Sequence, residues 1–423
     1  MTIYPFLVAG AFGLVIAYLL TPPVAWTATQ LGVLDRPGGR HIHRAPVPRL
    51  GGLAIYLAFV AAVLVGLPVE RPIHVAFETH RITVVIPYLP AIDRPIVALL
   101  LGATLITLVG VLDDVRGTRP LVKLLGQIAA AAVLLPFGVG MDVLTNPLGG
   151  MFFVGPLGAL VTVVWIVALC NVMNLIDGVD GLASGIAAIA GTTLLIAAYH
   201  RGDIGTAILA AALAGAALGF IPYNFNPARI FLGDTGSMLL GYLLGALSVL
   251  GTYKSYTALS LLVALVALGV PVTDTAFAIA RRWRNRRPIF EADTQHLHHR
   301  LLQRGFTPRQ TVSVLYLVTG ILSAGALMVS GVGRFPIIVI LGLLLAALSL
   351  GARRTRLLAP SAAPSPAAAP VAMAAVVAAE GGAAQGVGAA PLPGALPGGL
   401  AGPGGAPAGH TEFDGLDLGR SKQ

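Results

Sequence analysis

Five aspartates stand in short motifs with asparagine, glycine or serine at the polar ends of apolar runs, and a sixth lies just before a basic, histidine-rich stretch. The motifs are GVLDDVRG, NVMNLIDGVDGL, FLGDTGS and PVTDT, and the aspartates are Asp113, Asp114, Asp177, Asp180, Asp234 and Asp274. A carboxylate at a membrane border is costly to desolvate, so acids concentrated there indicate a site for a metal ion or another cation. This pattern favours an enzyme.

The pattern of oxygen-bearing side chains suits Mg2+, with Mn2+ as the alternative ion. Mg2+ prefers oxygen ligands and keeps positions for phosphate oxygens. We take Asn174 and Asp234 as the candidate metal ligands. The alternative is structural: Asn174 would cap the following helix, and Asp234 would close a turn in the GDTGS loop. Motifs that share one membrane face favour the metal site.

A basic, histidine-rich stretch forms the second chemical signal. It contains His296, His298 and His299 and eight arginines between positions 281 and 309. On a helix, His296 and His299 share a face. Zinc is disfavoured because neither a cysteine nor an HExxH pattern accompanies them. Pyrophosphate binding suits the histidines, whereas for most of the arginines a patch that binds anionic lipids is the favoured alternative.

The composition predicts the fold class. With 423 residues, 56% hydrophobic and 11% charged, the chain is that of an all-α polytopic membrane protein. A span needs about 20 apolar residues. We predict ten or eleven spans, from the runs 3–21, 51–67, 94–112, 121–138, 154–171, 182–199, 205–222, 237–251, 257–280, 310–330 and 335–351. These form a domain over 1–352, followed by an Ala/Pro/Gly-rich tail over 353–423 that we predict to be disordered and cytoplasmic.

The distribution of arginine predicts the orientation. Alternate loops lie on the same side of a bilayer, and the loops that carry the motifs also carry most of the arginines. By the positive-inside rule these loops face the cytoplasm and the N-terminus lies outside. We therefore expect a multi-pass protein of the inner or plasma membrane, with its active site on the cytoplasmic face.

Five motifs in order resemble a known superfamily. They are DRPGGRHIHRAPVPRLGG, GVLDDVRG, NVMNLIDGVDGL, NPARIFLGDTGS and DTQHLHHRLLQRGF, which together span residues 35–306. This set is similar to that of the polyprenyl-phosphate N-acetylhexosamine-1-phosphate transferases, the superfamily of MraY, WecA and TagO. The HLHHRL loop lacks three adjacent histidines and resembles the branch that takes UDP-N-acetylglucosamine.

The resemblance implies roles for individual residues. Asp113 matches the proposed base that deprotonates the lipid phosphate, Phe231 would stack on uracil, and the histidine motif is linked to the pyrophosphate or the sugar. The candidate catalytic residues are Asp113, Asp114, Asp177, Asp180, His296, His298 and His299. The candidate substrate-binding residues, from the same motifs, are Phe231, Asn171, Arg49 and Arg300. Asn174, Asp177 and Asp180 match the nucleotide-facing, Mg2+-associated motif.

The implied reaction transfers N-acetylglucosamine-1-phosphate from UDP-N-acetylglucosamine to undecaprenyl or decaprenyl phosphate. It releases UMP and leaves a polyprenyl-diphospho-sugar, the first lipid-linked step of a cell-envelope polysaccharide. The runner-up is the phospho-N-acetylmuramoyl-pentapeptide transferase reaction, which makes lipid I. A cation-coupled transporter would place its carboxylates near the bilayer midplane. The expected partners are the UDP-sugar, the polyprenyl phosphate and the bilayer, with no nucleic acid, and the sequence leaves a homodimer open.

Overall fold

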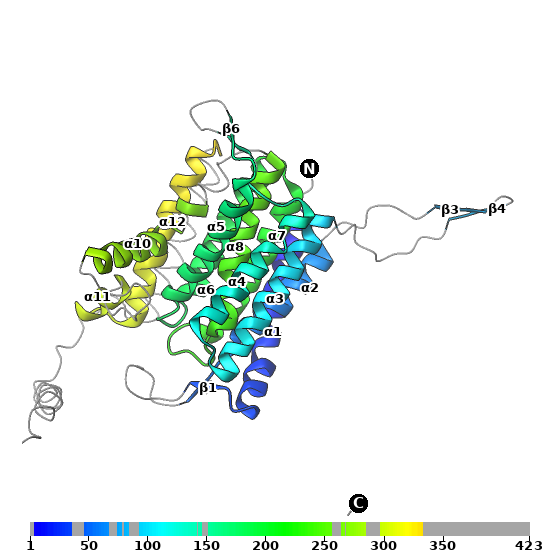
Figure 1. Ribbon diagram of the computed structural model, residues 1–423. Helices are drawn as coiled ribbons and strands as arrows, with labels where there is room; N and C mark the ends of the chain where they lie inside the picture. The colour runs from blue at the N-terminus through cyan, green and yellow to red at the C-terminus, as the bar shows by residue number, and fades with distance from the viewer. Residues whose placement is uncertain are drawn as a thin grey trace, which may run out of the picture. The chain divides into compact units, whose positions relative to one another are not determined.

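The computed structural model describes residues 4–35, 46–66, 74–77, 80–83, 93–141, 143–145, 151–255, 264–266, 268–284 and 297–332. All of them belong to the first of two units of the chain, residues 1–361. The described part is mostly helical, so the all-α prediction is confirmed (Figure 1). The second unit, residues 362–423, lies outside the described residues. The predicted domain boundary at 352 and the predicted disorder of the tail therefore stay predictions.

Helices follow one another along most of the described chain. They are α1 (Tyr4–Gln30), α2 (Gly51–Gly66), α3 (Arg94–Arg116), α4 (Pro120–Ala132), α5 (Leu157–Ile176), α6 (Leu182–His200), α7 (Ile204–Asn224), α8 (Gly233–Ser255), α10 (Gly269–Arg284), α11 (Leu297–Gln303) and α12 (Pro308–Val329). Three antiparallel strand pairs lie between helices: β1 (Leu34–Asp35) with β2 (Val47–Pro48), β3 (His74–Phe77) with β4 (His80–Thr83), and β5 (Val143–Thr145) with β6 (Met151–Phe153). A 3-10 turn, η1 (Leu135–Phe137), extends α4.

Most of the predicted spans are helices in the structure. Within the described residues, eight helices are long and apolar enough to cross a membrane, and α2 is a shorter apolar helix. These account for nine of the predicted runs. The run 257–280 is described only in part, chiefly as α10, and the run 335–351 lies outside the described residues.

The first span is longer than predicted. We expected it to end at residue 21, before Pro22 and Pro23, but α1 continues through both prolines to Gln30. Val24 and Ala28 are buried beyond the prolines, so the packing of α1 continues past them. In a membrane, neighbouring helices hold a helix together across a proline that would end it elsewhere.

The core of the bundle is α8, which is almost fully buried. It packs against α2, α3, α5, α6 and α7. Glycines allow the closest approaches between helices, since a side chain at Gly215 or Gly219 in α7 would meet the backbone of Gly10 or Leu14 in α1. Helix α8 is therefore enclosed by other helices of the bundle.

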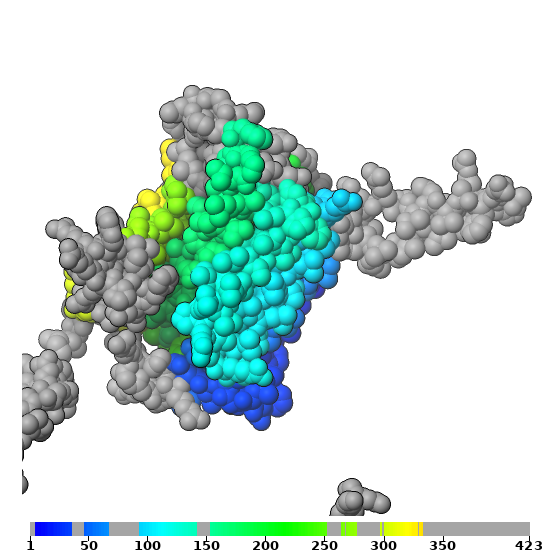
Figure 2. Space-filling view, in the orientation of Figure 1, coloured from blue at the N-terminus to red at the C-terminus, as the bar shows by residue number. Residues whose placement is uncertain are grey.

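The outer helices present large apolar side chains. Figure 2 shows α3 and α4, in cyan, forming one continuous face of the molecule. Leu101 and Leu108 of α3, and Leu121 and Leu125 of α4, are exposed on these helices. A soluble protein rarely leaves so much contiguous apolar surface uncovered, whereas lipid chains cover it in a bilayer. The described bundle is that of a multi-pass membrane protein.

Candidate active site

Side chains from three helices meet where α3 ends and where α4 and α8 begin. The Lys123 ammonium on α4 lies 2.7 Å from Asp113 Oδ2 on α3, and it also binds Asp234 Oδ2 on α8. All three side chains are at least partly buried. An ion pair in such surroundings is screened less than one at an open surface. We call Asp113, Lys123 and Asp234 the charged cluster.

Further hydrogen bonds hold the two carboxylates of the charged cluster. Asp113 Oδ1 accepts from the backbone nitrogen of Thr118 at 2.8 Å and from its hydroxyl at 2.5 Å. Asn174 Nδ2, on α5, donates to Asp234 Oδ1 at 2.9 Å and to Ser237 Oγ at 3.0 Å. Each carboxylate is therefore fixed in orientation by a second group.

The two predicted metal ligands are in direct contact. Neither residue has the structural role that was the alternative. Gly181, and not Asn174, is the N-cap of α6, and Asp234 lies in the first turn of α8 and not in a loop turn. Asn174 presents its amide nitrogen, not its oxygen, to Asp234. Its role as a direct ligand, like that of Asp234, stays a prediction.

The donor set of the charged cluster fits a hard divalent cation. Oxygens of Asp113 and Asp234 already converge on one cation, the Lys123 ammonium. In the described part of the chain, no group of three or more His, Cys, Asp or Glu side chains is arranged to hold a metal ion. Carboxylate oxygens are ligands that Mg2+ takes, and a metal ion at this place stays a prediction.

Asp114 has different partners from its neighbour. Its carboxylate accepts hydrogen bonds from the backbone nitrogens of Asp234 and Thr235, each at 3.0 Å, and from the Thr235 hydroxyl at 2.6 Å. Asp114 thus caps the N-terminus of α8 from α3. Gly233 has a φ of +72°, and a side chain there would meet the Asp114 carboxylate. The structure places Asp114 where it orients Asp234, and its predicted catalytic role stays a prediction.

Asp177 follows the last turn of α5, among the other acids. Its pKa lies well above the usual value, first because burial penalises the charged form and then because Asp234, Asp114 and Asp180 add negative charge nearby. Arg49 acts in the opposite direction. Asp177 therefore holds a proton more readily than an exposed aspartate.

Two predicted site residues serve the chain segment before α8. Asp180 Oδ2 accepts from Asn226 Nδ2 at 2.9 Å and from the backbone nitrogen of Ala228 at 3.0 Å. The backbone nitrogen of Phe231 donates to Pro48 O at 2.8 Å. The structure therefore brings both residues to the same end of the bundle as the charged cluster.

The Gly51–Gly52 pair explains the position of Phe231. The backbone nitrogens of these glycines donate to Phe231 O at 3.0 Å and to Leu232 O at 2.9 Å. A side chain at Gly52 would meet the backbone of Thr235 and Gly236 in α8. Glycine is needed here because the two chains approach so closely.

Two further predicted residues lie at this end of the bundle. Arg49 Nε is 4.0 Å from Asp35 Oδ1. Asn171 lies one turn before Asn174 on α5 and donates to Gln127 Oε1 of α4 at 2.7 Å. Their predicted contacts with substrate stay predictions.

The histidine motif is only partly described. His296 lies outside the described residues, and the side chains of His298 and His299 are outside the described side chains. Both belong to α11, as does the exposed Arg300. Asp274, on α10, accepts a hydrogen bond from the backbone nitrogen of Leu297 at 2.9 Å and so ties the start of α11 to α10. The roles of the histidines and of Arg300 stay predictions.

Lys123 is a site residue that none of the sequence motifs contains. It lies within the apolar run 121–138 and outside every motif. An ionisable residue in a membrane-spanning segment is itself a signal for a functional site, and this signal would have identified it.

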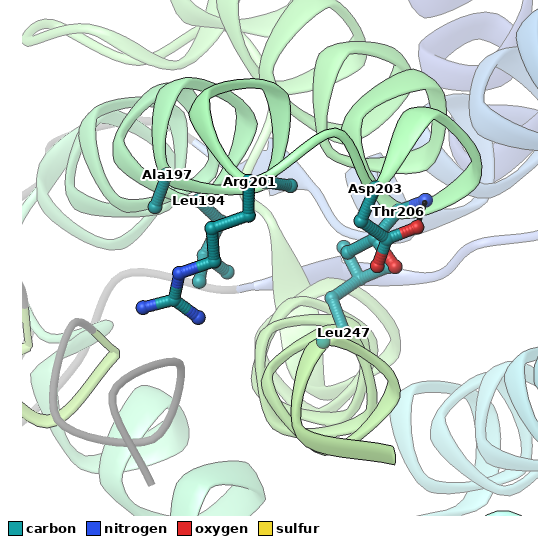
Figure 3. Close-up of a pocket in the computed structure, with 8 residues that line it drawn as sticks. Leu194, Ala197, Arg201, Asp203, Thr206 and Leu247 are labelled. Carbon is teal, nitrogen blue, oxygen red and sulfur yellow. Dashed lines mark hydrogen bonds between the residues drawn. The ribbon is translucent and has the colours of Figure 1, made fainter. Parts of the chain in front are cut away.

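A small cavity, lined by both apolar and polar residues, lies away from these residues (Figure 3). Its volume is about 10 Å³, close to the least that can hold one water molecule. Arg201, Asp203 and Thr206 line it, at the turn between α6 and α7. Since α6 starts near the acidic residues and runs away from them, the cavity lies at the opposite end of the bundle. It contains none of the predicted site residues.

Comparison with known proteins gives consistent matches. The model of glycosyl transferase family 4 matches residues 96–252, which include all the acidic residues of the site. A probable undecaprenyl-phosphate N-acetylglucosaminyl 1-phosphate transferase of Bacillus subtilis is 39% identical over 321 residues, covering 76% of this chain and 84% of the relative. The decaprenyl-phosphate N-acetylglucosaminephosphotransferase of Mycobacterium tuberculosis is 37% identical over 350 residues, covering 75% and 80%.

A more distant relative is the undecaprenyl-phosphate alpha-N-acetylglucosaminyl 1-phosphate transferase of Escherichia coli K12. It is 25% identical over 306 residues, covering 70% of this chain and 76% of the relative. These relatives confirm the resemblance and do not favour the muramoyl-pentapeptide and transporter alternatives. The chain belongs to glycosyl transferase family 4, in the branch of the polyprenyl-phosphate N-acetylglucosamine-1-phosphate transferases.

Proposed function

We propose that this protein transfers N-acetylglucosamine-1-phosphate from UDP-N-acetylglucosamine to a polyprenyl phosphate. The observation that carries the proposal is the charged cluster, in which Asp113, Lys123 and Asp234 from three helices meet at one end of an apolar bundle. The names of the relatives support the acceptor and the sugar. A site at a membrane border reaches both a lipid phosphate and a water-soluble nucleotide sugar.

In the proposed reaction, an oxygen of the polyprenyl phosphate attacks the sugar-proximal phosphorus of the donor. A new P–O bond forms to the lipid phosphate, the bond to the UMP oxygen breaks, and UMP leaves with the electron pair. Both reactants are anions, so catalysis depends on positioning and on neutralising charge. The Lys123 ammonium is a positively charged group at the site that can contribute to this neutralisation.

The chain's own residues divide this work. The Lys123 ammonium supplies positive charge beside the Asp113 and Asp234 carboxylates. Asp113 is the candidate proton acceptor for the lipid phosphate. Asp234 and Asn174 are the candidate ligands of Mg2+, which when bound neutralises phosphate oxygens. Asp114 keeps the first turn of α8, and with it Asp234, in place.

We further propose that the site end of the bundle faces the cytoplasm, as the arginine distribution indicates. A cysteine at position 290 in a Cys170→Ser background would then be shielded from an impermeant thiol reagent in intact cells, and a cysteine at position 80 would react. Labelling at position 290 from outside contradicts this orientation. The sequence leaves a homodimer open, and light scattering of the detergent-solubilised protein distinguishes a monomer from a dimer.

The proposed activity is tested with purified protein in detergent. Radiolabelled UDP-N-acetylglucosamine and undecaprenyl phosphate are supplied with Mg2+, and label is followed into the organic phase while UMP is measured in water. We expect equal amounts of lipid-linked product and UMP, and none of either with EDTA or without the lipid.

A donor panel separates this function from the runner-up. UDP-muramoyl-pentapeptide is assayed beside UDP-N-acetylglucosamine, and we expect product only from the smaller donor. Product from the muramoyl-pentapeptide alone would assign the chain to lipid I synthesis. Decaprenyl phosphate in place of undecaprenyl phosphate measures the preference for prenyl length.

A further inference from the structure

The segment that joins α7 to α8, residues 225–232, is held at Asn226 from two sides. The side chain of Asn226 donates through Nδ2 to Asp180 Oδ2 at 2.9 Å. Its backbone oxygen accepts from Arg309 Nε, in the first turn of α12, at 2.8 Å. One residue thus links the α5–α6 turn, the α7–α8 segment and α12.

The carboxylate of Asp180 is directed to this segment. Both hydrogen bonds that it makes within the described part of the chain go to residues 226–228, the second from the backbone nitrogen of Ala228 at 3.0 Å. The two carboxylates of the charged cluster bind different groups: both bind Lys123, Asp113 accepts from Thr118, and Asp234 accepts from Asn174. Asp180 therefore differs from Asp113 and Asp234, which face a cation.

Neighbouring bonds fix the same elements to one another. The Tyr316 hydroxyl of α12 donates to Gly181 O, directly after Asp180. Asn224 Nδ2 donates to Ile230 O at 3.1 Å, and Ser184 Oγ of α6 donates to Asn224 Oδ1 at 2.9 Å. The start of α6 and the start of α12 are thus both tied to the segment that leads to α8.

We propose that Asp180 is a positioning residue and that Asp180, Asn226 and Arg309 form a clamp on the 226–232 segment. The proposal rests on the proposed function, because what the clamp positions is Phe231 and Asp234, the residues expected to meet the uracil and the metal. A carboxylate that accepts hydrogen bonds from two donors of one segment holds that segment in place. A carboxylate that takes up a proton or binds a metal ion would instead face the reactants. α12 takes part in the site through Arg309, although it carries none of the acids.

A reversal of the Asp180–Asn226 pair tests the clamp. The variants are Asp180→Asn, Asn226→Asp and the two together. In the wild type, Asn226 Nδ2 and the nitrogen of Ala228 both donate to Asp180 Oδ2. An asparagine at 180 can still offer one oxygen to both donors, so we expect Asp180→Asn alone to lose little. Asn226→Asp sets two carboxylates against each other, and we expect it to lose about 10–100-fold in kcat/KM, as supporting residues of metal sites do. In the double variant the amide nitrogen at 180 can donate to the carboxylate at 226 at the cost of the bond from Ala228, and we expect it to recover about tenfold over Asn226→Asp.

The way in which activity is lost separates positioning from chemistry. Since the clamp acts through Phe231 and Asp234, we expect Asn226→Asp and Arg309→Ala, and to a small extent Asp180→Asn, to raise the KM for UDP-N-acetylglucosamine and the Mg2+ concentration for half-maximal activity. A catalytic carboxylate would lower kcat with little change in either. Asp203→Asn is the matched control. Like Asp180, Asp203 accepts a hydrogen bond from a backbone nitrogen, but it lies at the start of α7, at the far end of the bundle from the charged cluster.

Two results overturn the clamp: a double variant as inactive as Asn226→Asp, or a large and pure loss of kcat in Asp180→Asn. Wild-type protein is assayed first, and absence of product from it refutes the proposed function instead. In that event the clamp is judged by thermal unfolding of the same four proteins in detergent. Non-additive changes in melting temperature support the bond between 180 and 226, and additive changes refute it.

Discussion

Asp113 and Asp114 are neighbours in the chain, yet they serve two different regions. Asp113 belongs to the charged cluster, where its partner is the Lys123 ammonium. Asp114 faces the start of α8 and accepts two backbone hydrogen bonds and one from the Thr235 hydroxyl. The first region holds charge that can meet a substrate, and the second holds the helix that carries Asp234. The pair shows that one carboxylate can place the site in which the other acts.

The charged cluster is broken most directly at Asp234. We expect Asp234→Asn to lower kcat by about 10²–10³-fold, because the change removes a charge at the point where phosphates are neutralised. The substitution keeps the size of the side chain, but its amide nitrogen faces either Asn174 Nδ2 or the Lys123 ammonium, so kcat is measured below the melting temperature of the variant in detergent. Near-normal turnover at saturating Mg2+ would remove Asp234 from the list of ligands.

Replacement of Lys123 removes the cation and leaves two carboxylates facing each other. We expect Lys123→Met to lose about 10²-fold in activity, while Lys123→Arg, which keeps the charge, loses less. Raising Mg2+ is expected to restore part of the activity of Lys123→Met, since the metal then supplies the missing positive charge. Equal activities of the two variants would show that the charge of Lys123 has no part in the reaction.

The second region is tested through stability. Asp114→Asn replaces one acceptor oxygen by an amide nitrogen, which faces N–H donors that it cannot bind. We expect a loss of about 1–3 kcal/mol in the free energy of unfolding, measured by denaturant titration in detergent. Asp113→Asn is the matched variant, and we expect it to lose activity with less change in stability. A reversed order would contradict the division between the two aspartates.

We expect substitution of Asp177 to have the smallest effect, which is a change in how the free energy of unfolding depends on pH. Its pKa is raised in the folded protein by burial and by nearby carboxylates, so folding stabilises the protonated form. The free energy of unfolding therefore falls as pH rises above about 4, the pKa of an unfolded aspartate. Asp177→Asn mimics the protonated form and removes this slope. Melting temperatures from about pH 5 to pH 8 should show an advantage of the variant that grows with pH.

The helical bundle and the end at which its motifs meet could be read from the sequence, because apolar runs and loop parity constrain both. Which partner each carboxylate takes could not. Asp113 and Asp114 stand side by side in one motif, and only the direction of each side chain from α3 separates them. The same holds for Asp180, whose partner Asn226 is 46 positions away.

Lys123 and α1 show two further limits. Lys123 belongs to no motif, and its contact with Asp234 joins two residues that are 111 positions apart in the chain. The length of α1 depends on how Val24 and Ala28 pack, which the two prolines before them conceal. Contacts of this kind are set by the packing of whole helices, so local patterns do not contain them.

Lys123 also bears on how this end of the bundle assembles. Two neighbouring carboxylates repel each other as helices come together, unless a positive charge arrives with them. Here that charge belongs to the same chain, so the acidic residues are balanced as soon as α3, α4 and α8 are in contact. Small zinc domains, by contrast, unfold when their ion is removed. We therefore expect a chelator to inhibit this protein reversibly. Turnover should stop while the protein stays folded in the membrane, and it should resume when Mg2+ is added back.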